Sequence, residues 1–197
     1  MKDKIKIYNE DCLQAMRLMS DKQFDLAIVD PPYGIDVKTR VFDDGKHWDS
    51  NTPTKEYFDE LFRVSNNQII WGGNYFDLPP TQGFYIWDKK QPHDFSLAMC
   101  EMAWSSLQKP AKMWSLSVLK ERNKIHPTQK PVQLYEWLLM NNAEQGFEIL
   151  DTHLGGGSIA IACHNLGYNL TACEIDYQYF TDATERLRIA QSQLTMF

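Results

Sequence analysis

The sequence predicts one α/β domain built around a doubly wound, mostly parallel sheet. Short apolar runs of strand length alternate along the 197 residues with segments whose apolar side chains recur at helical spacing. Several runs end in acidic or glycine-rich turns, at the strand ends where open α/β sheets bind ligands. Near the C-terminus, a strand, a glycine turn, a helix and a strand ending in an acidic residue form a βαβ unit.

The first predicted elements are a strand, a helix and a buried strand. Residues 4–8 alternate apolar and polar side chains and predict the first strand. Polar residues 9–11 then cap a helix through about Met19, with Leu18 on its apolar side. Residues 24–29 are apolar enough for a buried strand. Asp11 therefore stands between a strand and a helix, and on the residues alone it is a helix N-cap.

The middle of the chain combines a polar loop with a helix and several strands. Residues 34–51 are polar, charged and punctuated by glycine, so we expect a loop beside the site. A helix begins near Thr52-Pro53 and places Tyr57, Phe58, Leu61 and Phe62 in the core. Apolar runs predict strands over 68–71, 84–87, 99–104 and 113–116.

The last third contains three helices and two strands. Pro131 begins a helix that extends to about Asn141, with Leu134, Trp137 and Leu138 buried. Strands are predicted over 147–151 and 169–173, separated by a helix that ends before Gly167. The final helix covers 177–193 and packs Phe180, Ala183, Leu187 and Ala190 inward. Because no linker or repeat divides the chain, we expect 1–197 to be a single domain.

Composition is ordinary for a globular protein in water. Hydrophobic residues make up 43% and charged residues 23% of the chain, and no apolar stretch is long enough to span a membrane. We expect no signal peptide, because the first residues lead directly into the alternating strand pattern. The cysteines form no C-x-x-C pair, so we expect free thiols, a cytoplasmic location and no membrane partner.

The turn Asp30-Pro31-Pro32-Tyr33 follows the apolar run 24–29 and ends that strand abruptly. It places a carboxylate and an aromatic ring on a rigid corner at the carboxyl end of a strand. This corner suits a planar NH2 group, whose delocalised lone pair makes it a poor nucleophile. Asp30 and the Pro31 carbonyl can each accept one N–H, which frees the lone pair, while Tyr33 stacks on the attached ring. The alternative is a structural Pro-Pro turn after a core strand, in which Asp30 is only a helix or turn cap.

Two further stretches direct polar groups toward a ligand. His126-Pro127-Thr128-Gln129-Lys130-Pro131 lies at the N-terminus of a predicted helix. Asp151 and Gly155-Gly156-Gly157-Ser158 form the turn of the βαβ unit, and Glu174 ends its second strand, where a carboxylate can hold a ribose diol. The turn has neither G-x-G-x-x-G spacing nor the G-K-[ST] of a P-loop, so the usual dinucleotide site and a P-loop are not supported.

Together these three motifs resemble the permuted, beta-class-like amino-methyltransferases that use S-adenosylmethionine on DNA, of the small type found in phages and bacteria. That family combines an Asp/Asn/Ser-Pro-Pro-Tyr motif, a His-Pro-Thr-Gln-Lys-Pro segment and a glycine turn, in the order found here between Asp11 and Glu174. The resemblance implies a Rossmann-like methyltransferase fold with circularly permuted motif order. It also implies site-specific methylation of adenine N6 in DNA, on a flipped base and without a covalent enzyme intermediate.

The resemblance also assigns the site residues. Asp30, Pro31, Pro32 and Tyr33 would be catalytic. The cofactor-binding residues would be Asp11, Cys12, Asp30, His126, Thr128, Lys130, Asp151, Gly155, Gly156, Gly157, Ser158 and Glu174. In this set Glu174 would hold the ribose hydroxyls and Asp11 the adenine amine. His126, Thr128 and Lys130 would reach the carboxylate of the methionine part. His153 and Leu154 depart from the commoner Pro-Phe at their positions, which leaves contacts from His153 open.

DNA would be the partner of such an enzyme. The net charge of −6 argues mildly against nucleic acid, but the basic residues gather in one part of the chain, between Lys109 and Lys130. A basic strip along a phosphate backbone and a solvated lysine-rich loop explain this charge equally well. We expect DNA contacts from residues 34–51 and 89–125. With so short a chain, recognition is modest or needs a second subunit, as in a homodimer.

Other activities make different demands on the sequence. Methylation of cytosine N4 stays open because its amine poses the same problem, although Asp at the first motif position usually accompanies adenine in the resembling family. Methylation of cytosine C5 needs a cysteine nucleophile, usually after proline, and no cysteine here follows proline. A non-catalytic module that binds S-adenosylmethionine or DNA is a further alternative without a supporting feature. The histidines lack ligand spacing with the cysteines, so no metal is expected.

Overall fold

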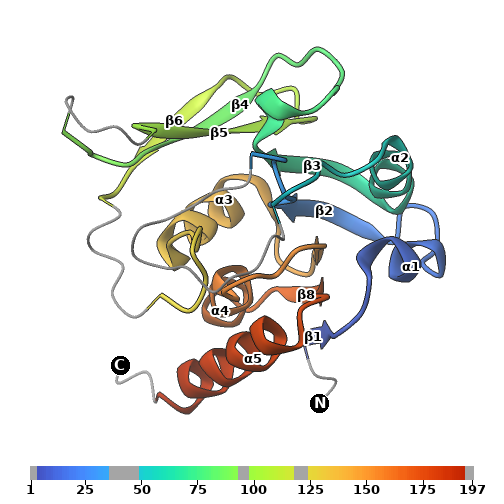
Figure 1. The fold of residues 1–197 in the computed structure, drawn as a ribbon, viewed down its shortest axis with the longest axis vertical. Helices are drawn as coiled ribbons and strands as arrows, with labels where there is room; N and C mark the ends of the chain where they lie inside the picture. Colours follow the sequence, from blue (N-terminus) through green and yellow to red (C-terminus); the bar gives the residue numbers. More distant parts are fainter. Residues whose placement is uncertain (1–3, 36–48, 93–97, 118–123, 194–197) are drawn as a thin grey trace.

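The computed structural model describes residues 4–35, 49–92, 98–117 and 124–193. Within these ranges, one eight-stranded sheet has the strand order β1-β8-β7-β2-β3-β5-β4-β6, with helices on both faces (Figure 1). The strands are β1 (Ile5–Tyr8), β2 (Phe24–Val29), β3 (Ser65–Trp71), β4 (Phe84–Asp88), β5 (Cys100–Ser105), β6 (Lys112–Ser115), β7 (Glu148–Asp151) and β8 (Asn169–Cys173). The helices are α1 (Cys12–Arg17), α2 (Lys55–Val64), α3 (Val132–Asn142), α4 (Ser158–Leu166) and α5 (Tyr177–Ser192), with a 3₁₀ turn η1 (Gly73–Tyr75).

The sheet is mostly parallel. Strands β1, β8, β7, β2 and β3 all run in the same direction, and β6 is parallel to β4. Only β5 runs against its two neighbours, β3 and β4. The predicted fold class, a doubly wound and mostly parallel α/β sheet, is therefore confirmed. The permuted motif order stays a prediction.

Two apolar clusters hold the layers together, one on each face of the sheet. Along β2, Leu26 and Ile28 pack with α3, α4 and α5, whereas Ala27 and Val29 pack with α1 and α2. This division follows from the pleat, because successive side chains of a strand point to opposite faces. A strand covered by helices on both faces needs apolar residues at every position, which is why residues 24–29 form an almost continuous apolar run.

The winding of the chain determines where a ligand can bind. Strands β7 and β8 lead into α4 and α5 on one face of the sheet, and β2 leads toward α2 on the other. The winding therefore changes direction between the neighbouring strands β7 and β2. A crevice forms beyond the carboxyl ends of the strands at such a switch point. The Asp30 turn, the glycine turn and Glu174 all follow strands that end there.

All of the predicted helices are present, but some of their ends and buried residues differ from the prediction. Helix α1 begins at its N-cap Asp11, whose carboxylate accepts from the Gln14 amide at 2.9 Å, but it ends at Arg17. Leu18, predicted on the apolar side, lies past that end and is 88% exposed. In α3, Tyr135 is buried and Trp137 is only half-buried. In α5, Tyr179 is buried in place of the predicted Phe180. Helical spacing alone leaves the phase of the buried face uncertain by one residue.

None of the helices in the described ranges has the length and apolar character needed to cross a bilayer. Most of the loop expected over 34–51 lies outside the described residues, as do 93–97 and 118–123 of the expected DNA-contacting segment 89–125. The described part of 89–125 contains β5 and β6, close to the strands predicted over 99–104 and 113–116.

Candidate active site

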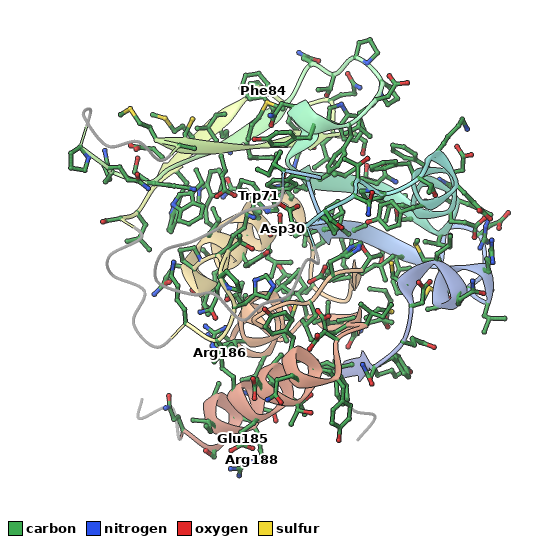
Figure 2. The ribbon with its side chains drawn as sticks, in the orientation of Figure 1. Asp30, Trp71, Phe84, Glu185, Arg186 and Arg188 are labelled. Atoms are coloured by element: carbon green, nitrogen blue, oxygen red, sulfur yellow. The ribbon has the colours of Figure 1, made fainter. Side chains whose placement is uncertain are left out.

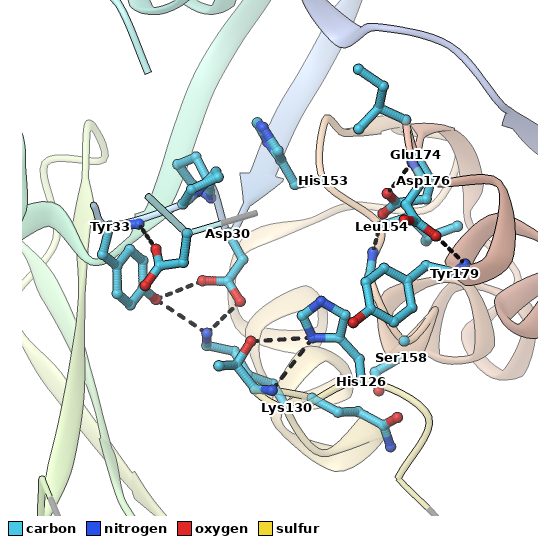
Figure 3. A pocket seen from close by; sticks show the side chains of 18 of the residues that line it. Asp30, Tyr33, His126, Lys130, His153, Leu154, Ser158, Glu174, Asp176 and Tyr179 are labelled. Carbon is cyan, nitrogen blue, oxygen red and sulfur yellow. Dashed lines mark hydrogen bonds and ion pairs between the residues drawn. The ribbon is translucent and has the colours of Figure 1, made fainter. Parts of the chain in front are cut away.

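A cavity of about 250 Å³ lies beyond the carboxyl ends of β2, β7 and β8 (Figure 3). Most of the residues predicted from the sequence line it, although they come from four separate parts of the chain. These lining residues are Asp30, Pro31, Pro32, Tyr33, His126, Thr128, Lys130, Gly155, Gly156, Ser158 and Glu174. The two halves of the chain therefore meet at one cavity. Asp30 lies near the middle of the molecule, and charged residues of α5 such as Glu185 and Arg188 lie at its periphery (Figure 2).

The Asp30–Tyr33 corner is held by its own side chains. The Tyr33 hydroxyl donates to Asp30 Oδ1 at 2.6 Å. The Tyr33 ring stacks on Tyr75 of η1, with centroids 5.0 Å apart and an interplanar angle of 11°. Gly72 packs against another part of the ring, since a Cβ built there would lie 2.2 Å from Tyr33 Cε1. The ring is thus fixed at the cavity wall before any ligand binds.

Asp49 fixes the backbone of the same corner. Its side chain is only 3% exposed, and Oδ1 accepts from the amide of Tyr33 at 2.6 Å and from the amide of Gly34 at 3.1 Å. Two backbone donors that follow the prolines are satisfied by this one carboxylate. Asp49 also lines the cavity. Asp49, which follows the segment that begins at Gly34, is therefore bonded to the residues where that segment begins.

Lys130 connects the corner to a second strand. Its ammonium donates to Asp30 Oδ2 at 2.5 Å and to the Tyr33 hydroxyl oxygen at 3.2 Å (Figure 3). It also forms an ion pair with Glu101 Oε2 of β5 at 3.0 Å, while Lys89 pairs with Glu101 Oε1 at 2.5 Å. The Lys130 side chain is 1% exposed. Asp30, Lys130, Glu101 and Lys89 thus form a buried chain of alternating charge.

Each charge in this series of ion pairs stabilises the charged form of its oppositely charged neighbour. Burial raises the pKa of Asp30, and Lys130 opposes that shift. Burial lowers the pKa of Lys130, but Asp30 and Glu101 outweigh it and raise the pKa of the ammonium. Burial would also raise the pKa of Glu101, yet Lys130 and Lys89 lower it to about 2. Burial and the neighbouring Asp30 hold the pKa of Tyr33 well above 10, so its hydroxyl is a donor.

The segment before α3 forms a second wall. Thr128 places its hydroxyl 3.2 Å from His126 Nδ1, and the His126 ring packs edge-on against Tyr179 of α5 with centroids 4.4 Å apart. Gln129 Oε1 accepts from the Ile125 amide at 3.1 Å. These contacts fix a turn of polar side chains at the start of α3, as the sequence predicts for this segment.

The glycine turn and Glu174 form the third wall. Glu174 Oε2 accepts from the Gly155 amide at 2.8 Å, and Oε1 accepts from the Asp176 amide at 2.9 Å. Gly157 has φ +71° and lies against α5, where an added Cβ would be 3.0 Å from Ala183 Cβ. Only glycine suits both the positive φ and the close contact with α5. The turn and the carboxylate therefore form one rigid unit that faces the cavity.

Four predicted residues do not line the cavity, namely Asp11, Cys12, Asp151 and Gly157. Asp11 accepts from the Gln14 amide as the N-cap of α1. Cys12 Sγ lies 3.9 Å from Nε2 of His153, which does line the cavity. Asp151 accepts from the His153 amide at 3.1 Å. Burial raises the pKa of Asp151 to about 8 and lowers that of His153 to about 4, so the imidazole is neutral.

Several functional neighbours were not predicted. The cavity also has Asp49, Gln129, Tyr135, Ile175, Asp176 and Tyr179 in its lining, and Glu101 stands behind Lys130. A charged residue inside the apolar strand pattern around Glu101 is a signal that points to a buried partner. Asp49 gives no such signal, because a carboxylate in a polar loop is ordinary. Within the described ranges, no three His, Cys, Asp or Glu side chains are arranged to hold a metal ion.

Sequence comparisons place this site among known proteins. The chain is 23% identical to the type II methyltransferase M.HpaI of Haemophilus parainfluenzae over 90% of its length, covering 72% of that protein. It is 24% identical to the type II methyltransferase M2.DpnII of Streptococcus pneumoniae over 71% of its length, and there it spans only about half (48%) of the relative.

Structure comparisons give the same fold. The complex of M1.HpyAVI with SAM superposes with a TM-score of 0.65 at 22% identity, covering 92% of this chain and 99% of that one. The PvuII DNA methyltransferase, which is cytosine-N4-specific, superposes with a TM-score of 0.66 at 11% identity, covering 94% and 90%. The N6_N4_Mtase family model, described as DNA methylase, matches residues 84–185, which is just over half of the sequence. The chain therefore belongs to the family of N6/N4 DNA methylases.

Proposed function

We propose that this chain transfers a methyl group from S-adenosylmethionine to the N6 amino group of adenine in DNA. Its family makes it a DNA methyltransferase that acts on an exocyclic amine. One observation carries the proposal that the chain methylates an amine. The carboxylate of Asp30, the glycine turn and Glu174 line the same cavity, so an acceptor for amine hydrogens faces the residues suited to a nucleoside cofactor. The choice of adenine follows from Asp at the first position of the Asp30-Pro31-Pro32-Tyr33 motif.

The cavity residues fit S-adenosylmethionine. Glu174 is held by two backbone amides with its carboxylate at the cavity, which suits the two hydroxyls of a ribose. The glycine turn keeps side chains out of the way of a ligand that approaches the backbone. His126 and Thr128 present polar groups for the carboxylate of the methionine part. When bound, the cofactor supplies a methyl group on a positively charged sulfur.

The opposite wall prepares the target amine. Asp30 and the Pro31 carbonyl accept its two hydrogens, which turns the nitrogen lone pair away from the ring. This interaction strengthens as positive charge develops on nitrogen, so it favours the transition state over the ground state. Tyr33 supplies a ring for stacking, a contact worth roughly 1–3 kcal/mol in base recognition. Because the amine is inaccessible inside a duplex, the base is flipped out of the helix to reach this wall.

DNA contact is proposed for the segments 34–51 and 89–125. Several lysines of the second segment and its border already have partners, among them Lys90, which pairs with Asp88 at 3.1 Å. Lys89 and Lys130 pair with Glu101, and Lys109 and Lys112 donate to Asn141 and Asn142 at the C-terminal end of α3. The bonds from Lys109 and Lys112 satisfy groups at a helix end, where cations are favourable. We expect the basic residues of both segments to give DNA binding that weakens as the salt concentration rises.

The test is tritium transfer from labelled S-adenosylmethionine to DNA, followed by digestion and separation of the modified nucleosides. We expect N6-methyladenine from the wild type and none from Asp30→Ala. Asp59→Ala, which removes an exposed carboxylate on α2, serves as the matched control and should keep wild-type activity. N4-methylcytosine as the only product would overturn the base assignment. Cofactor or DNA binding without any methyl transfer would identify a non-catalytic module, and activity in Asp30→Ala would overturn the role of Asp30.

A further inference from the structure

Glu101 is a largely buried carboxylate that pairs with two lysines, Lys89 and Lys130. Its Oε1 pairs with Lys89 at 2.5 Å, so the carboxylate is already neutralised from that side. Its Oε2 is buried and lies 3.0 Å from the Lys130 ammonium, yet it has no aligned hydrogen bond to any described residue. The ion pair offsets the charge of Oε2, but a poorly aligned contact is weaker than an aligned charge-assisted hydrogen bond. This poor alignment suggests that Oε2 accepts a better hydrogen bond from Lys130 in another arrangement of the site.

The hydrogen bonds of Asp30 indicate what that other state is. In the structure, Oδ1 accepts from Tyr33 and Oδ2 accepts from Lys130. An ammonium placed this close weakens the attraction of Asp30 for a positive charge that develops on the target amine. It also occupies one of the two lone pairs of Oδ2, which leaves a single acceptor site on that oxygen for an amine hydrogen. Lys130 has a second carboxylate within 3.0 Å, so a small rotation about its side chain bonds moves its hydrogen bond from Asp30 to Glu101.

We propose that Glu101 is a positioning residue for methyl transfer, which takes over the hydrogen bond of Lys130 when the target amine binds and so leaves Asp30 Oδ2 to accept an amine hydrogen. This inference rests on the proposed function, because it assigns a step in the binding of that substrate. Glu101 does not touch the reacting atoms. It acts through Lys130, and Lys89 keeps the Glu101 side chain in place from the opposite side.

The surroundings of Asp30 determine the pH behaviour of this arrangement. The titratable groups that act on it are Lys130, Glu101, Tyr33, Asp151, Tyr135 and Tyr57. Among them only Lys130 is a cation. If Glu101 loses its charge, the ammonium stays on Asp30, and its uncompensated positive charge lowers the pKa of Asp30. The acid limb of the rate then moves to lower pH while the plateau rate falls.

The experiment measures single-turnover methyl transfer at saturating S-adenosylmethionine and DNA, with dissociation constants measured separately. In Glu101→Gln we expect the plateau rate constant to fall about 10- to 100-fold. The dissociation constants should stay within about threefold, and the acid limb should move to lower pH. Glu60→Gln is the matched control, because Glu60 has the same 20% side-chain exposure and pairs with Arg63 on α2, outside the cavity lining. It should transfer methyl groups at the wild-type rate with an unshifted acid limb.

A second variant covers the case in which Glu101→Gln does not fold. Glu101→Asp keeps the charge but is one methylene shorter, so it cannot reach both lysines equally. We expect an intermediate rate constant and a smaller shift of the acid limb. A wild-type rate in Glu101→Gln, or in Glu101→Asp if the first variant is unfolded, would overturn the proposal. A slow variant with an unshifted acid limb would show that Glu101 has only a structural role and would overturn the proposal. No methyl transfer by the wild type would instead overturn the proposed function itself.

Discussion

Replacing Asp49 with alanine should loosen the corner that carries Asp30 and Tyr33. The substitution leaves the amides of Tyr33 and Gly34 without the carboxylate that accepts them at 2.6 and 3.1 Å. A hydrogen bond to a charged group contributes roughly 1.5–3 kcal/mol, so the loss of two predicts at least about 3 kcal/mol of destabilisation. For a domain of this size that lowers the melting temperature by about 6–12 °C.

Chemical denaturation measures this loss directly, and single-turnover methyl transfer well below the melting temperature measures its effect on the site. We expect the rate constant to fall in Asp49→Ala, because the Tyr33 backbone is no longer held. Asp49→Asn keeps an acceptor oxygen without the charge and should lie between alanine and wild type. Asp59→Asn removes a carboxylate that is 58% exposed and should change the free energy of unfolding by less than about 0.5 kcal/mol. An Asp49→Ala protein within about 1 kcal/mol of wild type would refute this account.

Three further outcomes test the site. The pKa of Asp151 is raised by burial from 3.8 to about 8, so its contribution to stability is greatest below pH 3.8 and decreases toward pH 8. The free energy of unfolding of Asp151→Asn, relative to that of wild type, should therefore increase as the pH rises from 5 to 8.5 in denaturation curves. A difference that stays constant with pH would contradict the raised pKa. Gly72→Ala, with φ +70° and a Cβ 2.2 Å from the Tyr33 ring, should lose about 2–5 kcal/mol, whereas Gly146→Ala, with φ +94° and open space, should lose only the backbone part of about 1–2 kcal/mol. Tyr33→Phe keeps the ring but loses the hydroxyl bond to Asp30, so its rate constant should fall up to about tenfold. This loss should be much smaller than the loss in Tyr33→Ala. Equal losses in the two variants would show that stacking contributes nothing.

The sequence predicted the elements around the site because each has a local cause. The apolar run 24–29 and the prolines after it define β2 and its end at Val29. The strand over 169–173 and the acidic residue after it likewise follow from the pattern of their own residues. Where parallel strands of one sheet end together, the residues after them meet, and this places Asp30 and Glu174 at one cavity.

The contacts among the site residues could not be predicted in the same way. Lys130 meets Asp30 across 100 positions of sequence, and nothing in either segment specifies that pairing. On the sequence alone, Lys130 suited an anionic ligand, and Tyr33 offered only a ring for stacking. The hydroxyl bond to Asp30 arises from the three-dimensional arrangement of the corner. Likewise, Lys109 and Lys112 suited DNA by charge, but α3 ends beside them and its polar groups receive their hydrogen bonds.

The bonds from Asp49 to Tyr33 and Gly34 also bear on how such a protein can change over evolution. They join the two ends of the segment between Gly34 and Asp49, so the chain departs from and returns to one fixed point beside Asp30. Closing a loop between fixed ends costs only about 0.6 kcal/mol more for each doubling of its length. Insertions and deletions in this segment can therefore alter what it contacts while the geometry at Asp30 stays the same. The DNA contacts proposed for this segment can in this way change while the corner that carries Asp30 is kept.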